Sequence, residues 1–113
     1  MVKDEILTEE EIANINFIDL GIKSDDTNPS IITDLTGIEY FTFLCSLEAY
    51  NNNISSIDLS NNTELYYLDL SDNPIKTLDV SSLSELFTLN CCNTKLTGID
   101  LSKNRIDIIF LFF

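Results

Sequence analysis

Two carboxylates, Glu48 and Asp69, are the residues of this chain whose type and spacing could do chemistry. A pair of carboxylates can serve as acid and base in glycoside hydrolysis, or it can select a basic partner. Aromatic side chains lie close to both in the sequence, at Tyr50, Tyr66 and Tyr67. Since aromatic rings supply contact area in protein interfaces, the same residues also fit a docking surface.

Other catalytic groups are missing from the sequence. The chain has no histidine, and it shows no nucleophile elbow, phosphate-binding glycine loop or cluster of metal ligands. Its three cysteines lack C-x-x-C spacing, which predicts neither a zinc site nor a disulfide framework. The formal net charge of -13 would repel nucleic acid and anionic membrane surfaces. We therefore expect no cofactor, no metal, no nucleic-acid partner and no enzymatic activity, with a carboxylate-based hydrolase as a remote alternative.

A 21-residue repeat must position these side chains. Its pattern is L-x-x-L-x-[L/A/C]-x-x-[N/T]-x-[L/I]-x-x-[L/I], and three copies begin at Leu44, Leu65 and Leu86. The middle of each unit alternates apolar and polar residues, as a half-buried strand requires. Because one such strand cannot bury its apolar face alone, the units are expected to stack into a parallel sheet over a continuous core.

The repeat resembles that of leucine-rich repeat proteins, and residues 35–41 (LTGIEYF) resemble a segment of the internalin-like bacterial proteins. The resemblance implies an α/β-type solenoid with a parallel β-sheet on the concave face, a short helical N-terminal cap and an irregular, turn-rich convex side. It implies a short helical turn at residues 35–41. It also implies a secreted or cell-surface protein that binds a protein or glycan through the concave face, although the first residues show no signal peptide.

The whole chain is predicted to be a single leucine-rich repeat domain, residues 1–113. Its expected parts are an N-terminal cap at 1–14, an irregular first repeat at 15–43 with an inserted loop at 24–30, regular repeats at 44–105 and a partial last repeat at 106–113. Thr8 and Glu11 have the spacing of a capping box that opens a short helix. The acidic residues 4–11 half match a calcium-binding segment, and calcium binding there is a minor alternative.

The apolar residues 106–113 are too short to cross a bilayer and are expected to form a strand. No polar cap follows them in the sequence, which predicts an open sheet edge and self-association through it. A repeat fragment that self-associates and has no dedicated ligand is therefore an alternative to a binding module.

Outward residues of successive strands should align in columns on the concave face. The expected columns are Asp19, Glu48, Asp69, Asn90 and Phe110, and beside them Phe17, Ser46, Tyr67, Thr88 and Ile108. From these we predict a surface for a protein partner, with a basic one favoured by the carboxylates, made of Tyr50, Glu48, Tyr66, Tyr67, Asp69, Phe87 and Asn90. The alternative is that these residues are only the solvated face of a sheet.

The repeat also predicts structural roles and degrees of burial for further residues. Asn52, Asn73 and Thr94 are expected to form a ladder that bonds backbone groups where the chain turns off each strand, with solvated turn residues as the alternative. We predict that Leu68, Leu70, Leu89 and Cys91 are buried, that Tyr67, Asp69 and Asn90 are exposed, and that Asp58, Asp79 and Asp100 form turns.

Overall fold

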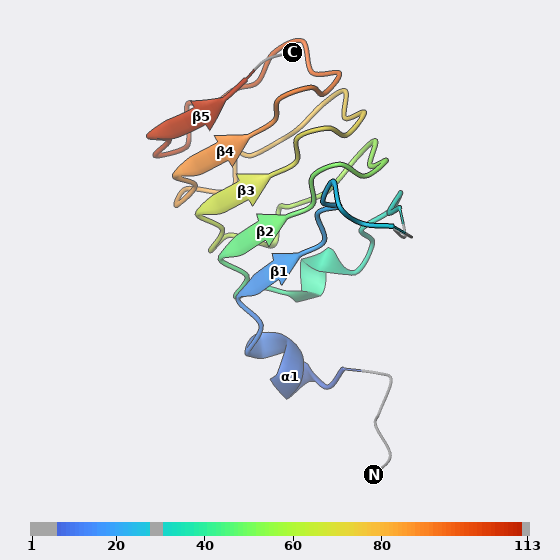
Figure 1. The fold of residues 1–113 in the computed structure, drawn as a ribbon. Coiled ribbons are helices and arrows are strands. Elements are labelled where there is room, and N and C mark those ends of the chain that lie inside the picture. The colour runs from blue at the N-terminus through green and yellow to red at the C-terminus, as the bar shows by residue number, and fades with distance from the viewer. Residues whose placement is uncertain (1–6, 28–30, 112–113) are drawn as a thin grey trace.

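Short parallel strands, one from each turn of a coiled chain, form a five-stranded sheet (Figure 1). The computed structural model describes residues 7–27 and 31–111. The strands are β1 Phe17–Asp19, β2 Ser46–Glu48, β3 Tyr67–Asp69, β4 Thr88–Asn90 and β5 Ile108–Phe110, and they pair in chain order. The predicted solenoid with a parallel sheet is thereby confirmed, and we call the side of the sheet that faces away from the core its outer face.

The strand register aligns side chains of the same repeat position. Asp19 pairs with Glu48, Glu48 with Asp69, and Asp69 with Asn90, while Phe110 completes the column. The second predicted column is aligned in the same way and contains Phe17, Ser46, Tyr67, Thr88 and Ile108. Because strand side chains alternate, both columns lie on the outer face, opposite the inward-facing leucines.

The core lies behind the sheet and contains the apolar repeat positions. The residues predicted to be buried, Leu68, Leu70, Leu89 and Cys91, have no exposed surface. Burial also raises the pKa of the Cys91 thiol to about 12, so this sulfur stays protonated and packs as a small hydrophobe. The repeat therefore places one continuous layer of apolar side chains under the outer face.

A residue in the left-handed backbone conformation turns the chain at the end of each central strand. Asn51, Asp72 and Asn93 have φ values of 60°, 57° and 57°. Asn and Asp adopt this conformation more readily than other residues with a side chain, because their short polar groups can bond the local backbone. The side chains that follow, at the ladder positions, are thus aimed back toward the sheet.

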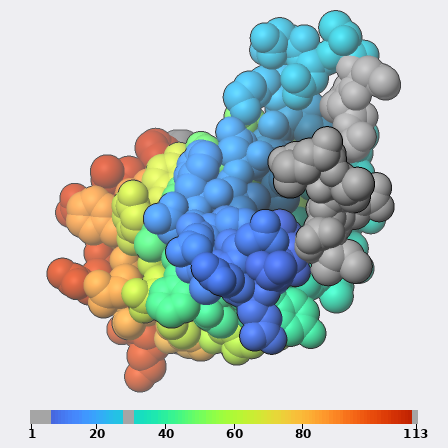
Figure 2. Space-filling model, turned by 90° about the horizontal axis from the view of Figure 1, so that it is seen from below, coloured from blue at the N-terminus to red at the C-terminus, as the bar shows by residue number. Residues whose placement is uncertain are grey.

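Helical structure lies at the N-terminal end and on the back of the solenoid. Helix α1, Glu9–Ala13, begins with the predicted capping box, in which the Glu11 amide donates to Thr8 Oγ1 at 3.1 Å and the Thr8 amide donates to Glu11 Oε1 at 2.8 Å. Figure 2 looks onto this end and shows the first residues of the described chain spread over it. The short 3₁₀ helix η1, Ile38–Tyr40, confirms the helical turn expected at residues 35–41.

Some of the predicted segments extend beyond the described residues. Residues 1–6 of the N-terminal cap, 28–30 of the inserted loop and 112–113 of the last repeat lie outside them, so those domain boundaries remain predictions. Within residues 7–27 and 31–111, no helix is long and apolar enough to cross a membrane.

Candidate functional site

A hollow on the outer face of the sheet brings together three of the predicted binding residues. It has a volume of about 490 Å³, and it is lined by Asn16, Phe17, Cys45, Ser46, Glu48, Tyr66 and Tyr67. These residues come from β1, β2 and β3 and from the positions just before them. We call this site the aromatic hollow.

The rings of the aromatic hollow are accessible from solvent. Phe17 and Tyr66 are 55% and 52% exposed, and Tyr67 is half-buried. Tyr66 and Tyr67 were predicted from the sequence to belong to the binding surface, whereas Phe17, Ser46 and Cys45 were not. The register contained the missing signal, because Phe17 and Ser46 occupy the same column as Tyr67.

The other predicted binding residues lie outside the hollow. Phe87 is 44% exposed and lies one turn beyond Tyr66, since its amide donates to the Tyr66 carbonyl at 2.9 Å. The Tyr50 ring lies against Gly21, where any larger side chain would overlap the ring. Lys23 Nζ lies 5.7 Å from the centroid of the Tyr50 ring and forms an ion pair with Asp19 Oδ2 at 3.2 Å.

The acidic column of the outer face contains one carboxylate that differs from its neighbours. In this column the side chain usually accepts a hydrogen bond from the backbone two residues later. The bonds join Asp19 to the Gly21 amide at 3.0 Å, Asp69 to the Ser71 amide at 3.0 Å and Asn90 to the Cys92 amide at 3.1 Å. Within the described residues, the Glu48 carboxylate makes no such bond and no ion pair. Its oxygens are therefore available to a ligand.

The prediction that Asp69 is exposed is wrong. Only 8% of its surface is accessible, while Tyr67 and Asn90 are half-buried. Asp69 Oδ1 accepts from both the amide and the hydroxyl of Ser71, the latter at 2.6 Å, which draws the carboxylate toward the backbone. Its register partners on both sides, Glu48 and Asn90, also shield it from solvent. Asp69 therefore contributes charge to the outer face but little contact area.

Burial and the charges of the column raise the pKa of two groups at the hollow. Burial, followed by the charges of Asp19 and Asp69, raises the pKa of Glu48, and Lys23 partly opposes this shift. Burial and the charges of Asp69 and Glu48 raise the pKa of Tyr67. Both shifts have a common cause, a partly desolvated surface of negative potential, and such a surface favours a cationic ligand.

Asn73 and Asn52 bond backbone groups of successive turns. Asn73 Oδ1 accepts from the Ile54 amide at 3.0 Å, and its Nδ2 donates to the carbonyls of Ala49 at 2.9 Å and Leu70 at 3.1 Å. Asn52 repeats this pattern one turn earlier. Among the described residues, Thr94 bonds only within its own turn, because its hydroxyl is too short to reach the preceding one. These side chains face the interior and bind backbone groups of the chain itself.

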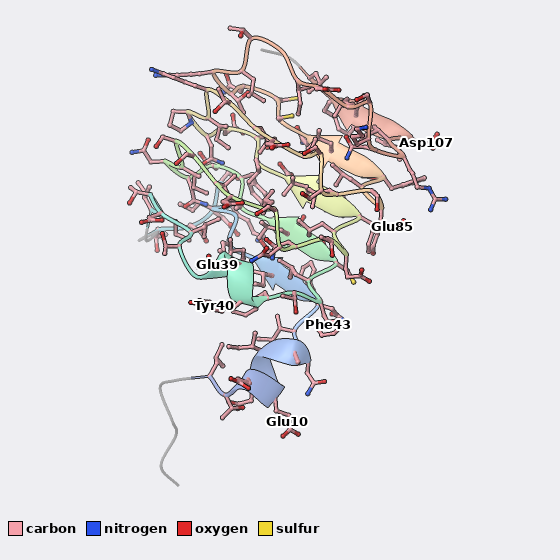
Figure 3. The ribbon with its side chains drawn as sticks, turned by 180° about the vertical axis from the view of Figure 1, so that it is seen from behind. Glu10, Glu39, Tyr40, Phe43, Glu85 and Asp107 are labelled. Atoms are coloured by element: carbon pink, nitrogen blue, oxygen red, sulfur yellow. The ribbon has the colours of Figure 1, made fainter. Side chains whose placement is uncertain are left out.

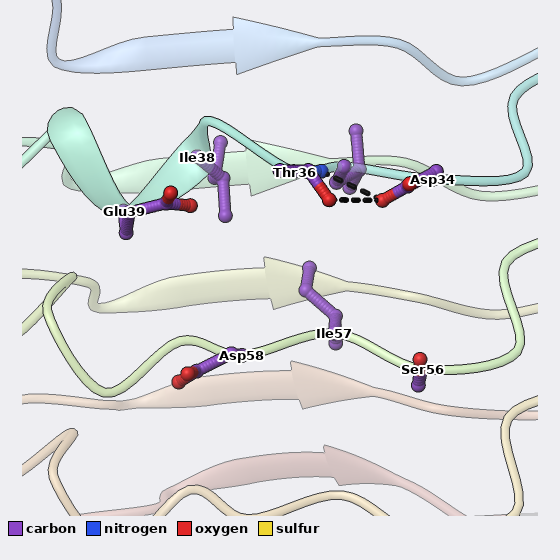
Figure 4. A pocket seen from close by; sticks show the side chains of 8 residues that line it. Asp34, Thr36, Ile38, Glu39, Ser56, Ile57 and Asp58 are labelled. Atoms are coloured by element: carbon purple, nitrogen blue, oxygen red, sulfur yellow. Dashed lines mark hydrogen bonds between the residues drawn. The ribbon is translucent and has the colours of Figure 1, made fainter.

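A second pocket lies on the convex side between two successive turns (Figure 4). Its volume is about 290 Å³, and it is lined by Asp34, Leu35, Thr36, Ile38, Glu39, Ser56, Ile57 and Asp58. Asp34 Oδ1 accepts from the amide and hydroxyl of Thr36, and Asp58 Oδ1 accepts likewise from Ser60. These bonds lower the pKa of both carboxyls. The carboxylates are thus turn formers, as predicted for Asp58.

Exposed aromatic residues also occur away from the outer face. Tyr40 and Phe43 are 67% and 56% exposed, and Figure 3 shows them in the view from behind. They lie apart from the acidic column. No group of three or more histidine, cysteine, aspartate or glutamate side chains is placed to hold a metal ion in the described part of the chain.

Comparison with known proteins identifies the fold. No family model matches the sequence, and no curated protein matches it. The functional domain of InlJ from Listeria monocytogenes, which includes a cysteine ladder, is 26% identical over 94% of this chain, with a TM-score of 0.59. Internalin C2 from the same species is 24% identical over 88% of this chain, with a TM-score of 0.64. This chain has an internalin-like leucine-rich repeat fold.

The internalin-like chain is shorter than the two proteins it resembles. It spans 26% of the InlJ chain and 47% of the internalin C2 chain. The fold comparison confirms the resemblance recognised in the repeat pattern, and it leaves the partner to be inferred from the outer face.

Proposed function

We propose that this internalin-like domain is a non-enzymatic module that binds a protein partner through the outer face of its sheet. The observation that carries the proposal is the aromatic hollow beside Glu48, whose carboxylate has no partner within the described residues. Exposed rings next to an available charge are the composition of a protein-binding surface. Internalin-like domains commonly bind proteins, which supports the same interpretation.

The partner's surface should be basic. The chain carries a formal charge of -13, and Asp19, Glu48 and Asp69 are aligned on the outer face. Complementary charge would steer a basic protein toward this face and discriminate against acidic ones.

Within this proposal the seven residues of the predicted surface have unequal roles. Glu48, Tyr66, Tyr67 and Phe87 offer contact area or an available charge, and Tyr50 is engaged with Lys23. Asp69 and Asn90 act mainly through the charge and polarity of their column. Asn52 and Asn73 bond the preceding turn and thereby maintain the register that aligns these side chains, whereas Thr94 bonds within its own turn. We further propose a bacterial cell-surface or secreted location, by analogy with the internalins.

A peptide-display selection tests the proposed face, because it does not require an identified partner. A random peptide library would be selected on the immobilised full chain, and the enriched peptides would be titrated against variants. We expect Tyr66→Ala and Phe87→Ala to weaken binding, whereas Tyr40→Ala, an exposed tyrosine away from the face, should not. Enriched peptides that respond only to Tyr40→Ala would contradict the proposal.

The enzymatic alternative requires a separate measurement. A panel of glycosides would be incubated with the wild-type chain and with Glu48→Gln. Turnover by the wild type that Glu48→Gln abolishes would show that the carboxylate pair is catalytic and would overturn the non-enzymatic interpretation.

A further inference from the structure

The aromatic hollow has an aromatic position on each side of a small one, and we call the space above the small residue the slot. In the strand register Ser46 lies between Phe17 on β1 and Tyr67 on β3. Neighbouring strands are about 4.8 Å apart, so the two aromatic positions are separated by roughly 9.6 Å across the small serine side chain. A planar group stacked between two rings needs about 3.5–4.0 Å on each side, which this spacing of strand positions accommodates.

A carboxylate lies next to this slot. Glu48 lines the same hollow and follows Ser46 by two residues on the same face of β2. Its column neighbours are already engaged, Asp19 with the Gly21 amide and Lys23, and Asp69 with Ser71. Glu48 is thus the acidic group of the hollow whose two oxygens remain available in the described structure.

The chain itself shows how a cation is held at the neighbouring position. Lys23 Nζ lies over the Tyr50 ring at 5.7 Å and pairs with Asp19 Oδ2 at 3.2 Å, which combines an aromatic face with a carboxylate of the acidic column. The aromatic hollow repeats the same combination one strand further, with two ring positions and Glu48, and the residues that line it include no lysine or arginine.

We propose that the aromatic hollow binds an arginine side chain of the protein partner, with the guanidinium stacked between Phe17 and Tyr67 above Ser46 and hydrogen-bonded to the Glu48 carboxylate. This inference rests on the proposed function, because it names the chemical group that the outer face receives. Arginine fits better than lysine, since its guanidinium is planar, stacks on rings and donates two parallel hydrogen bonds to one carboxylate.

The electrostatics of the hollow add a pH dependence to this binding. Burial, followed by the charges of Asp19 and Asp69, raises the pKa of Glu48 above its ordinary value, and Lys23 partly opposes this rise. A guanidinium binds the ionised carboxylate, so affinity should fall as the pH is lowered through the Glu48 pKa. A glutamine at this position should remove that pH dependence.

The test uses small probes of defined chemistry. N-acetyl-arginine amide, its lysine counterpart and its uncharged citrulline counterpart would be titrated against the full chain, with backbone amide signals followed by nuclear magnetic resonance. We expect the arginine probe to shift the signals of Phe17, Ser46, Glu48 and Tyr67. The lysine probe should bind more weakly and the citrulline probe weakest. Glu48→Gln should weaken the arginine probe ~10-fold or more, because a charge-assisted hydrogen bond is lost.

Matched variants separate the slot from the rest of the face. Ser46→Leu fills the space between the two rings and should abolish arginine binding. Ser84→Leu makes the same substitution at an exposed serine outside the sheet, and Glu64→Gln removes an exposed carboxylate elsewhere, so neither should change the affinity. Thermal unfolding of each variant would verify that it is folded.

Three results would overturn the arginine assignment: a lysine or citrulline probe that binds as tightly as arginine, Ser46→Leu without effect, or shifted signals remote from the hollow. Failure of the proposed function would give a different result in the peptide-binding experiment. If peptides selected on the outer face still bind Ser46→Leu and Glu48→Gln, the docking face stands and only its arginine occupant is rejected. If no selected peptide responds to Tyr66→Ala or Phe87→Ala, the docking face itself is rejected.

Discussion

Asn73 shows how a single side chain connects two turns of the solenoid. Its amide bonds backbone groups on both turns, and only 2% of the residue is exposed. Replacement by alanine would leave buried N–H and C=O groups unpaired, so we expect Asn73→Ala to lower the free energy of unfolding by about 1–3 kcal/mol. Asn61→Ala is the control, because Asn61 is exposed in a turn. Equal urea midpoints for the two variants would show that the ladder bonds of Asn73 do not contribute to stability.

The Glu48 carboxylate is expected to lower the stability of the fold while it contributes to arginine binding. Its pKa is raised in the folded chain, so the folded state holds the proton more tightly than the unfolded state. The ionised carboxylate therefore destabilises the fold at neutral pH, and this cost is relieved as the pH falls through the folded pKa. We expect Glu48→Gln to raise the unfolding temperature at pH 7 even as it weakens arginine binding. Glu64→Gln should leave the unfolding temperature unchanged, and a drop for Glu48→Gln would contradict the assignment.

At the scale of the element, the convex turns depend on ionised aspartates. Hydrogen bonds from Ser60, Ser81 and Ser102 lower the pKa of the aspartates two residues before them, Asp58, Asp79 and Asp100. The folded pKa lies below the unfolded one, which is about 3.9 for aspartate. Their stabilising contribution is present above the unfolded pKa and is lost as the pH falls through the folded pKa.

The hydrogen bond from Ser81 to Asp79 predicts how the stability of an Asp79 variant changes in acid. Asp79→Asn keeps an oxygen that can accept from the Ser81 amide, as Asn90 does from Cys92, but it removes the titrating group. We therefore expect Asp79→Asn to lose less stability than the wild type between about pH 5 and pH 2, an interval that spans the unfolded pKa. Chemical denaturation across this range would measure the difference. An unchanged slope of stability against pH would show that these turns do not contribute to acid unfolding.

The repeat pattern was sufficient to predict the strands and their register, because a period of two determines which face each side chain occupies. It could not predict the exposure of Asp69, since this depends on the bonding of its side chain to Ser71 and on the side chains of the neighbouring strands. Asn62 was overlooked for a related reason. It is fully buried and donates to the carbonyls of Ile38 and Phe41, but the next repeat carries Leu83 at the same position, which interrupts the pattern.

At the scale of the whole molecule, we predict self-association through the sheet edge at β5. In the described residues β5 pairs only with β4, and its Ile108 and Phe110 are 44% and 45% exposed. An apolar strand edge tends to pair with another chain, whereas the net charge of -13 keeps molecules apart. Added salt screens that charge, so association through the edge should strengthen as ionic strength rises.

Sedimentation velocity over a range of concentrations, at low and high salt, would measure this association. We expect the wild-type chain to form concentration-dependent dimers or larger species, with more of them at high salt. Phe110→Lys should shift it toward monomer, because the substitution places a charge on the edge strand. Phe43→Lys adds the same charge at another exposed phenylalanine, on the turn that leads into β2, so it should retain the association. A wild-type chain that sediments as a monomer at high concentration, or two lysine variants that behave alike, would show that β5 is not the surface of self-association.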